Sequence, residues 1–333
     1  MNDALVTVQS LTKNFDVSRP WLNRVFAGES KKILTAVDSV DFTIERGSTY
    51  ALVGESGSGK STIAKMLVGL LQPSSGRVHI DGVDLFTANA ADIARTRQRI
   101  QMIFQDPYAS LNPRWRVRDI VGEPIDAFMK TSSTERTRRV DELLEKVGLS
   151  SKDSAKFPHE FSGGQRQRIG IARALASDPE FIVCDEPTSA LDVSVQAQVL
   201  NLMRDLQRDL GLTYLFITHD LAVVQYMADH VGVLYLGRLI ESAPRQLLFN
   251  SPAHPYTQML IDAAPKVDGF GREHEAIEGE IPDPISPPSG CYFHPRCKQK
   301  LDQCSQQVPV VIHDKNIRSV SCLLHSNDTA SST

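Results

Sequence analysis

Two kinds of hydrophobic pattern follow one another along the chain. In the first 50 residues apolar and polar side chains alternate in short runs, at residues 5–8 and 40–44, which predicts strands of an antiparallel sheet. The runs at residues 49–53, 181–184 and 213–217 are apolar throughout, as expected of strands buried on both faces. We therefore predict an α/β core built on a parallel sheet, accompanied by an antiparallel β subdomain.

Helical spacing dominates much of the sequence between these runs. A helix is expected after residues 49–53, with Ile63, Met66, Leu67 and Leu70 at helical spacing. Residues 90–160 are rich in Arg, Glu and Leu and predict a mainly helical insertion. Two segments lack such periodicity. The polar insertion at 16–32 predicts a surface loop, and the proline-rich stretch 251–290 predicts extended connecting chain.

Composition narrows the class of protein. The chain has 333 residues, of which 41% are hydrophobic and 23% charged, as in an ordinary globular protein of about two domains. The net charge of −4 argues against a nucleic-acid partner. No apolar run approaches the ~18–20 residues that span a bilayer, and the first residues do not resemble a signal peptide. We therefore expect a cytoplasmic protein whose membrane role, if any, comes through partner subunits.

A glycine-rich loop directly follows the first buried run. Residues 54–62, GESGSGKST, match the phosphate-binding pattern G-x-x-x-x-G-K-[ST]. The glycines let backbone N–H groups face phosphate oxygens, and the start of the following helix favours an anion. The lysine reaches the β- and γ-phosphates, and the next hydroxyl ligates Mg²⁺. The residues expected to contact ATP are Gly54, Ser56, Gly57, Ser58, Gly59, Lys60, Ser61 and Thr62. This loop alone does not distinguish a kinase, a GTPase or a motor.

A second glycine motif narrows the choice. Residues 161–168, FSGGQRQR, followed by IGIARAL, resemble the signature of the ABC ATPases, with Phe161 at a packing position where the family usually has Leu. The motif predicts another helix N-terminus suited to an anion. In that family two subunits pack head to tail, and each ATP lies between the loop of one and the signature of the other. The resemblance thus implies ATP contacts from Ser162, Gly163, Gly164 and Gln165. The alternative is a simple glycine helix cap.

Two acids end the second buried run, in the sequence FIVCDEP at residues 181–187. Carboxylates at the end of a parallel strand lie at the sheet edge where ligands bind. The resemblance implies that Asp185 holds Mg²⁺ together with Ser61 and Gln105, and that Glu186 is the general base for the attacking water. The alternative for the two acids is a solvated turn. Cys184 is more simply a core residue.

Four further elements match the family pattern. Gln105 resembles the glutamine that senses Mg²⁺ and the attacking water and couples the helical subdomain to the membrane subunits. His219 resembles the switch histidine at the γ-phosphate, and residues 189–192 resemble the loop that crosses the dimer interface. Phe15 stands where an aromatic residue stacks on adenine, although a core phenylalanine is an alternative. We therefore expect Glu186, His219, Gln105 and Lys60 to be the catalytic residues.

Several segments resemble one group in particular, the oligopeptide/dipeptide importer ATPases. They are YASLNPR at 108–114, residues 190–198, HPYT at 254–257 and GCYFHPRC at 290–297. The resemblance implies a P-loop NTPase with a RecA-like core: an ABC ATPase domain over 1–250, its helical subdomain at about 100–178, and a C-terminal extension over 251–333. The cargo stays open, because the group includes importers of nickel chelates, glutathione and opines.

The same resemblance implies partners and a location. We expect a second ATPase subunit that is a distinct paralogue, two membrane permeases and, through them, an extracytoplasmic solute-binding protein, at the cytoplasmic face of a bacterial inner membrane. The competing classes are a soluble ABC ATPase of DNA repair or translation and a non-hydrolysing regulatory module. The single cassette without a long coiled coil argues against the first, and the presence of Glu186 and His219 against the second.

Four of the five cysteines lie near the C-terminus. Cys291, Cys297, Cys304 and Cys322 have the spacing C-x5-C-x6-C-x17-C. In a reducing compartment such a group favours a metal site over disulfides. Four thiolates can hold a [4Fe–4S] cluster or a zinc ion, and free thiols are the third alternative. The cofactors expected are therefore ATP and Mg²⁺, with an iron–sulfur cluster as the leading interpretation of the cysteines.

Overall fold

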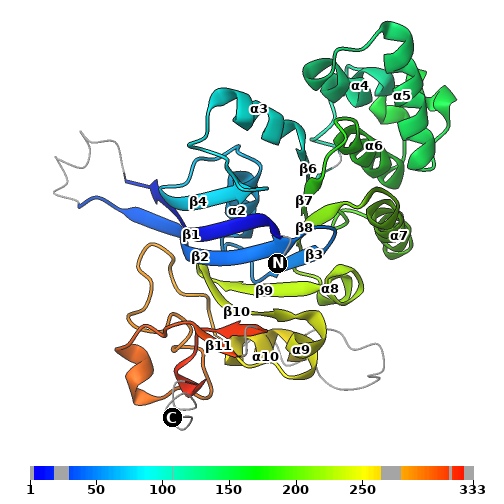
Figure 1. Cartoon of the computed structure of the whole chain (residues 1–333). Helices are drawn as coiled ribbons and strands as arrows, with labels where there is room; N and C mark the ends of the chain where they lie inside the picture. The colour runs from blue at the N-terminus through cyan, green and yellow to red at the C-terminus, as the bar shows by residue number, and fades with distance from the viewer. Residues whose placement is uncertain (1–3, 19–29, 107, 264–278, 315–316, 326–333) are drawn as a thin grey trace.

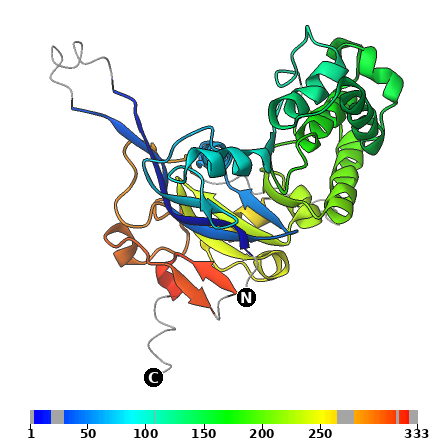
Figure 2. The same cartoon turned by 45° about the horizontal axis from the view of Figure 1, so that its top comes forward.

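A computed structural model describes residues 4–18, 30–106, 108–263, 279–314 and 317–325 (Figure 1). Two sheets form the body of the molecule, and a group of helices stands to one side of it (Figure 2). Within the described ranges, no helix combines the length and the apolar character needed to cross a bilayer.

The first sheet is antiparallel, as the alternating pattern predicts. It has four strands in the order β2-β1-β4-β5. Val6 of β1 pairs with Ile44 of β2 and with Ile80 of β4, so alternate apolar residues share the buried face. The middle of the insertion predicted at 16–32 lies outside the described residues. The strands are β1 (Ala4–Asp16), β2 (Ile33–Glu45), β4 (Ser75–Ile80) and β5 (Val83–Asp84).

The second sheet has eight strands, in the order β11-β12-β10-β9-β3-β8-β7-β6. From β9 to β6 neighbouring strands are parallel, and every residue of β3, β7 and β8 is buried, which confirms the prediction from the continuous apolar runs. The strands are β3 (Thr49–Val53), β6 (Ile100–Ile103), β7 (Phe181–Asp185), β8 (Thr213–Ile217), β9 (His230–Tyr235), β10 (Arg238–Pro244), β11 (Ile312–Asp314) and β12 (Arg318–Val320).

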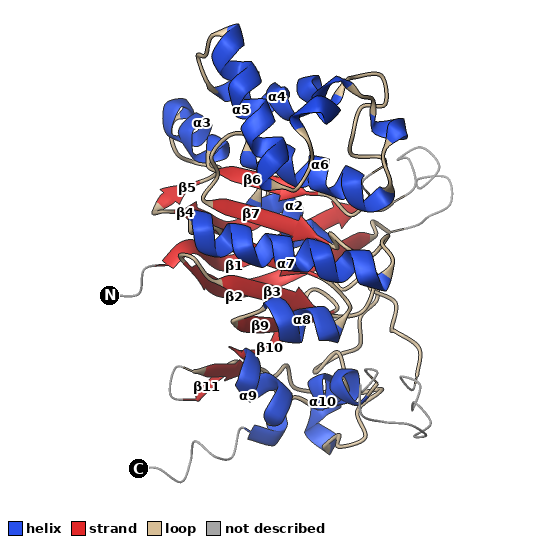
Figure 3. Cartoon of the chain, turned by 90° about the vertical axis from the view of Figure 1, so that its right-hand side faces the viewer, coloured by secondary structure: helices blue, strands red, loops and turns tan. Residues whose placement is uncertain are grey.

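Helices cover the sheets and build the side arm (Figure 3). Ile63, Met66 and Leu67 of α2 share an apolar cluster with residues of both sheets, whereas Leu70 lies beyond the helix end and is 65% exposed, so its assignment to the apolar face was wrong. The helices are α2 (Lys60–Leu67), α3 (Ala90–Gln98), α4 (Val117–Phe128), α5 (Ser133–Lys146), α6 (Gly163–Leu175), α7 (Val193–Leu210), α8 (Leu221–Met227), α9 (Arg245–Asn250) and α10 (Pro255–Asp262).

The helical arm is joined to the core through packed apolar side chains. Ile120 of α4, Leu144 of α5 and Ile171 of α6 belong to the same buried cluster as Ile182 and Phe216 of the parallel sheet. The prediction of a mainly helical insertion over 90–160 is confirmed except at β6, which pairs with β7 and joins the parallel sheet.

The C-terminal region is more ordered than its composition suggested. The stretch predicted as connecting chain contains α10, and β12 pairs with β10 so that the last strands extend the main sheet. The proline-rich composition did not predict this helix, although Pro255 lies in its first turn, where proline is tolerated. The C-terminal region therefore packs against the body of the molecule, with Tyr256 and Phe293 in the same apolar cluster as Val53 of β3.

Candidate functional site

The loop over residues 54–62 connects β3 to α2 and is packed closely from behind. Gly54 has φ +152°, and a Cβ there would come within 2.2 Å of the Leu234 carbonyl oxygen. Gly59, the N-cap of α2, has φ +104°, and a Cβ there would lie 2.3 Å from the Ala36 carbonyl oxygen. Both positions therefore require glycine, which lets the backbone turn and leaves the N-terminus of α2 open to an anion.

Lys60 lies inside this loop. Its Nζ donates hydrogen bonds to the carbonyl oxygens of Gly54 and Glu55, both at 2.8 Å, and lies 3.3 Å from Ser58 Oγ. Burial lowers the pKa of this ammonium, and the negative charges of Glu186 and Asp185 oppose the shift. The loop thus surrounds a positive charge where phosphate oxygens are expected.

Ser61 and Asp185 meet at the first turn of α2. Ser61 Oγ donates to Asp185 Oδ1 at 3.1 Å, and Asp185 is 8% exposed at the end of β7. Burial raises the pKa of the Asp185 carboxyl, while the Ser61 hydrogen bond lowers it. A hydroxyl and a carboxylate side by side are suitable oxygen ligands for Mg²⁺.

Glu186 links two of the other predicted residues. Its Oε2 accepts from Gln105 Nε2 at 2.9 Å, and its Oε1 lies 3.0 Å from His219 Nδ1. The residue has φ +47°, a conformation uncommon outside glycine, and its N–H donates to the Ile217 carbonyl at 2.9 Å. The backbone therefore directs this carboxylate toward Gln105 and His219.

Parallel strands explain why these residues meet. Gln105 follows β6, Asp185 and Glu186 end β7, His219 follows β8, and the glycine loop follows β3. The carboxyl ends of neighbouring parallel strands lie at the same edge of a sheet. Residues that are far apart in the sequence thus form one site beside Lys60 and Ser61.

The signature segment lies elsewhere, at the start of α6. Ser162 is the N-cap: its Oγ accepts from the Gln165 N–H at 3.4 Å, and the Ser162 N–H donates to Gln165 Oε1 at 3.0 Å. Both side chains are exposed, and Gly164 is buried against Val195. No hydrogen bond or ion pair joins residues 162–165 to Lys60 or Glu186, all of which are described. The structure therefore does not bring the signature to the chain's own phosphate loop.

Phe15 is also apart from the site cluster. It lies near the end of β1, where it pairs with Leu34 of β2 and is half-buried. Lys13 Nζ is 5.2 Å from the centre of its ring. Phe15 does not belong to the buried core of either sheet.

The four C-terminal cysteines come together. Burial, with smaller contributions from the thiols of Cys291, Cys297 and Cys304, raises the pKa of the Cys322 thiol to about 11. Backbone N–H groups approach the sulfurs, including Leu301 N–H, 3.4 Å from Cys304 Sγ. Among the described residues, no three His, Cys, Asp or Glu side chains are arranged to hold a metal ion. Cys184 is fully buried in β7, as predicted for a core residue.

Two residues of the extension that sequence reasoning assigned no role also reach the phosphate loop. Arg296 forms two hydrogen bonds with the Glu55 carboxylate, at 2.8 and 2.9 Å. The Tyr256 hydroxyl accepts from the Glu55 N–H at 3.0 Å. Both residues lie in motifs that the sequence analysis singled out, Tyr256 in HPYT and Arg296 in GCYFHPRC, and these motifs were the only indication of a role.

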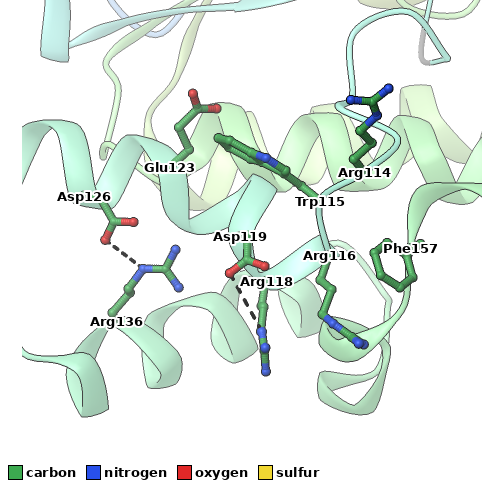
Figure 4. A pocket seen from close by; sticks show the side chains of 9 residues that line it. All are labelled: Arg114, Trp115, Arg116, Arg118, Asp119, Glu123, Asp126, Arg136 and Phe157. Carbon is green, nitrogen blue, oxygen red and sulfur yellow. Dashed lines mark hydrogen bonds and ion pairs between the residues drawn. The ribbon is translucent and has the colours of Figure 1, made fainter.

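A concave surface lies on the helical arm (Figure 4), and none of its lining residues belongs to the phosphate loop. Its volume is about 440 Å³, and an ion pair between Arg136 Nε and Asp126 Oδ1, 2.7 Å long, lies in its wall. Trp115 is 41% exposed beside it. The lining residues are Arg114, Trp115, Arg116, Arg118, Asp119, Glu123, Asp126, Arg136 and Phe157.

Comparisons with known proteins show which families the chain resembles. The family model described as "ABC transporter" matches residues 37–189, and that described as "Oligopeptide/dipeptide transporter, C-terminal region" matches residues 240–304. The probable peptide ABC transporter ATP-binding protein y4tS of Sinorhizobium fredii is 47% identical over 97% of this chain and 90% of its own length.

Two further similarities come from a relative and a solved structure. The putative oligopeptide transport ATP-binding protein YkfD of Bacillus subtilis is 46% identical, over 97% of this chain and 96% of its own. The dimeric, post-hydrolysis structure of the ATP-binding cassette MJ0796 with ADP and Pi has a TM-score of 0.62 and 28% identity. It covers 72% of this chain and 98% of that cassette.

Proposed function

Because the chain belongs to the family of ATP-binding subunits of ABC transporters, we propose that it hydrolyses ATP to power an importer of short peptides. The observation that carries this proposal is the joining of Glu186 to both Gln105 and His219 next to the phosphate loop. The peptide cargo is supported by the names of relatives that match nearly the whole chain, and by the match of the C-terminal region.

We assign each residue of the site a step in hydrolysis. The loop amides and Lys60 bind the β- and γ-phosphates, and Ser61 and Asp185 hold Mg²⁺ with Gln105. Glu186 accepts the proton of the attacking water, while Gln105 and His219 orient that water and the γ-phosphate. Burial of Asp185 beside Ser61 and Lys60 supports this assignment, since a buried charge in a protein is paired or coordinates a metal ion. Phe15 is proposed to stack on adenine.

The signature segment acts on a second subunit. Ser162, Gly163, Gly164 and Gln165 are proposed to contact the γ-phosphate of ATP held by the opposing ATPase, which closes the dimer. The exposure of Ser162 and Gln165 at a helix N-terminus supports this, as does their separation from Lys60 within one chain. Hydrolysis removes the bridging phosphate and opens the dimer, so that nucleotide binding drives a conformational switch.

Coupling to transport is assigned to the helical arm. Its concave surface combines an exposed Trp115 with charged walls and follows Gln105 in the chain, so we propose that a cytoplasmic segment of a permease docks there. The whole assembly would contain two permeases, a second and distinct ATPase, and an external solute-binding protein reached through the permeases. In this proposal the chain lies at the cytoplasmic face of the inner membrane, with an ATPase domain over 1–250 and an extension over 251–333.

The cysteine group is proposed to hold a [4Fe–4S] cluster with a structural role. The four thiols provide the number and type of ligands required, and backbone N–H groups near the sulfurs oppose part of the rise in thiol pKa that burial causes. The spacing C-x5-C-x6-C-x17-C contains no C-x2-C pair of the kind typical of zinc sites, which favours the cluster over zinc. The visible absorbance and iron content of anaerobically purified protein test this; zinc, or neither metal, would refute it.

The test of the main proposal is transport by the assembled complex. Purified with its permeases and reconstituted into vesicles, the protein should couple ATP hydrolysis to uptake of short peptides. Stimulation of hydrolysis by a nickel chelate, glutathione or an opine, and not by any peptide, would show that the cargo assignment is wrong.

A further inference from the structure

The C-terminal extension contacts the phosphate loop through the side chain of Glu55, the second residue of that loop. The Arg296 guanidinium and the Glu55 carboxylate form a two-point ion pair, and their side chains are only 2% and 15% exposed. Paired in this way, the two groups fix each other's orientation as well as their charge. Ile281, also from the extension, lines a small cleft with Ser56 and Ser58 of the loop.

The extension also holds the backbone of the same residue. The Glu55 N–H donates to the Tyr256 hydroxyl at 3.0 Å, while the Glu55 carbonyl accepts from Lys60 Nζ at 2.8 Å. Glu55 is thus bound at its carboxylate and its N–H by the extension, and at its carbonyl by the lysine that faces the phosphates. A displacement of Arg296 or Tyr256 therefore changes the loop next to Lys60.

The groups that make these contacts are themselves rigidly mounted. The Tyr256 ring packs on Tyr235 and Phe293, with ring centres 4.7 and 5.4 Å apart. The Arg296 guanidinium lies 5.8 Å from the Tyr235 ring centre. His254 caps α10 by accepting the Tyr256 N–H at 3.0 Å. The contacts on Glu55 therefore come from a packed unit rather than from mobile surface side chains.

We infer that Arg296 and Tyr256 are positioning residues that keep the phosphate loop in its nucleotide-binding form, so that the C-terminal extension sets the affinity for ATP. The inference rests on the proposed ATPase function and adds a role for the motifs HPYT and GCYFHPRC. If the loop is in its nucleotide-binding form for only a fraction of the time, the apparent Kd for ATP is the intrinsic Kd divided by that fraction. Once ATP is bound, its phosphates order the loop, and the chemical step is not affected.

The position of Arg296 also connects the loop to the cysteine group. Arg296 directly precedes Cys297, so a constraint on Cys297 restrains the arginine that holds Glu55. Such coupling is reciprocal. If an ordered extension raises the affinity for ATP, then ATP binding stabilises the ordered extension by the same free energy.

The experiment compares full-length variants. Arg296→Met and Tyr256→Phe remove the contacts with little change in volume, and Arg318→Met is the matched control. Arg318 is a 12% exposed arginine of the same extension that contacts Ser251 and Glu241 and not the loop. ATP dissociation constants are measured on the purified chain, and KM and kcat on the transporter complex.

Arg296→Met should raise the ATP Kd and KM about tenfold, the equivalent of ~1.4 kcal/mol, with kcat within about twofold of wild type. Tyr256→Phe should raise them severalfold, Arg296→Lys should restore part of the affinity, and Arg318→Met should leave them unchanged. An unchanged Kd in Arg296→Met, or an equal rise in Arg318→Met, would overturn the inference.

A second route covers the case in which Arg296→Met does not fold. Glu55→Gln leaves both residues of the extension in place and keeps an acceptor for Arg296, and should still raise the Kd severalfold by weakening the pair. An unchanged Kd there would equally contradict the inference. Failure of the wild-type chain to bind ATP at all would instead refute the proposed function.

Discussion

Glu186 Oε1 lies 3.0 Å from His219 Nδ1, across the ends of two neighbouring strands. The contact depends on the left-handed backbone of Glu186, at φ +47°, and on its N–H bond to the Ile217 carbonyl. Strained backbone of this kind is commonest where function requires a side chain in one direction. Here it holds the carboxylate between His219 and Gln105.

Replacement of Glu186 by glutamine should separate binding from hydrolysis. Glutamine keeps the size and hydrogen bonds of the side chain but cannot take up a proton, so kcat should fall about 10²–10⁴-fold while the ATP Kd changes little. Single-turnover phosphate release measures the effect. The control is Glu180→Gln, which precedes the other end of β7 and pairs with Arg99. Normal turnover by Glu186→Gln would exclude it as the base.

Removal of the Ser61 hydroxyl should weaken magnesium activation in a pH-dependent manner. Burial raises the pKa of Asp185 and the Ser61 hydrogen bond lowers it, so in Ser61→Ala a larger fraction of Asp185 carries a proton as the pH falls. The Mg²⁺ concentration for half-maximal hydrolysis should rise by about tenfold. The ratio of variant to wild type should be larger at pH 6 than at pH 8. A ratio that does not depend on pH would contradict the role given to Asp185.

His254 should make the free energy of unfolding depend on pH. Burial, with a contribution from His325, lowers the pKa of His254 to about 3, so the histidine is neutral in the folded chain and takes up a proton only on unfolding. Its contribution to stability is complete above the unfolded pKa of about 6.5 and is lost as the pH falls toward 3, at ~1.4 kcal/mol per pH unit. Urea unfolding at pH 7 and pH 5 measures this dependence.

The control for His254 is replacement by asparagine, whose carbonyl can accept the Tyr256 N–H in place of Nδ1. In this variant the free energy of unfolding should depend less steeply on pH, by the contribution of one proton. The contribution of His230, whose pKa burial lowers to about 4, should remain. Equal curves for His254→Asn and wild type would show that His254 is not neutral in the folded chain.

The sequence predicted the parts of this fold that have a local cause. The buried strands β3, β7 and β8 are predicted by the apolar runs at 49–53, 181–184 and 213–217, because an apolar run needs cover on both faces. The order of motifs after those strands was enough to predict that Lys60, Asp185 and Glu186 would share one edge. The packing of α10 and β12 against the body was not predicted, since proline-rich composition and three-residue strands carry little periodic signal.

Most of the features that the sequence did not predict are contacts between segments that are distant along the chain. The Glu55–Arg296 pair joins residues 241 positions apart, and nothing in the local pattern at either position reveals the other. The same holds for the four thiols, whose spacing left cluster, zinc and free cysteine open. At Ser162 the structure adds a capping bond with Gln165, so its hydroxyl has a structural role within the single chain.

The most direct test of the composite site is photo-crosslinking with an ATP analogue that carries an aryl azide on its γ-phosphate. In the assembled complex the analogue should label residues 162–165 of this chain. Labelling should persist in Lys60→Ala, because the nucleotide at this signature is held by the opposing subunit's loop. Loss of that labelling in Lys60→Ala, or its absence in the wild type, would contradict the account.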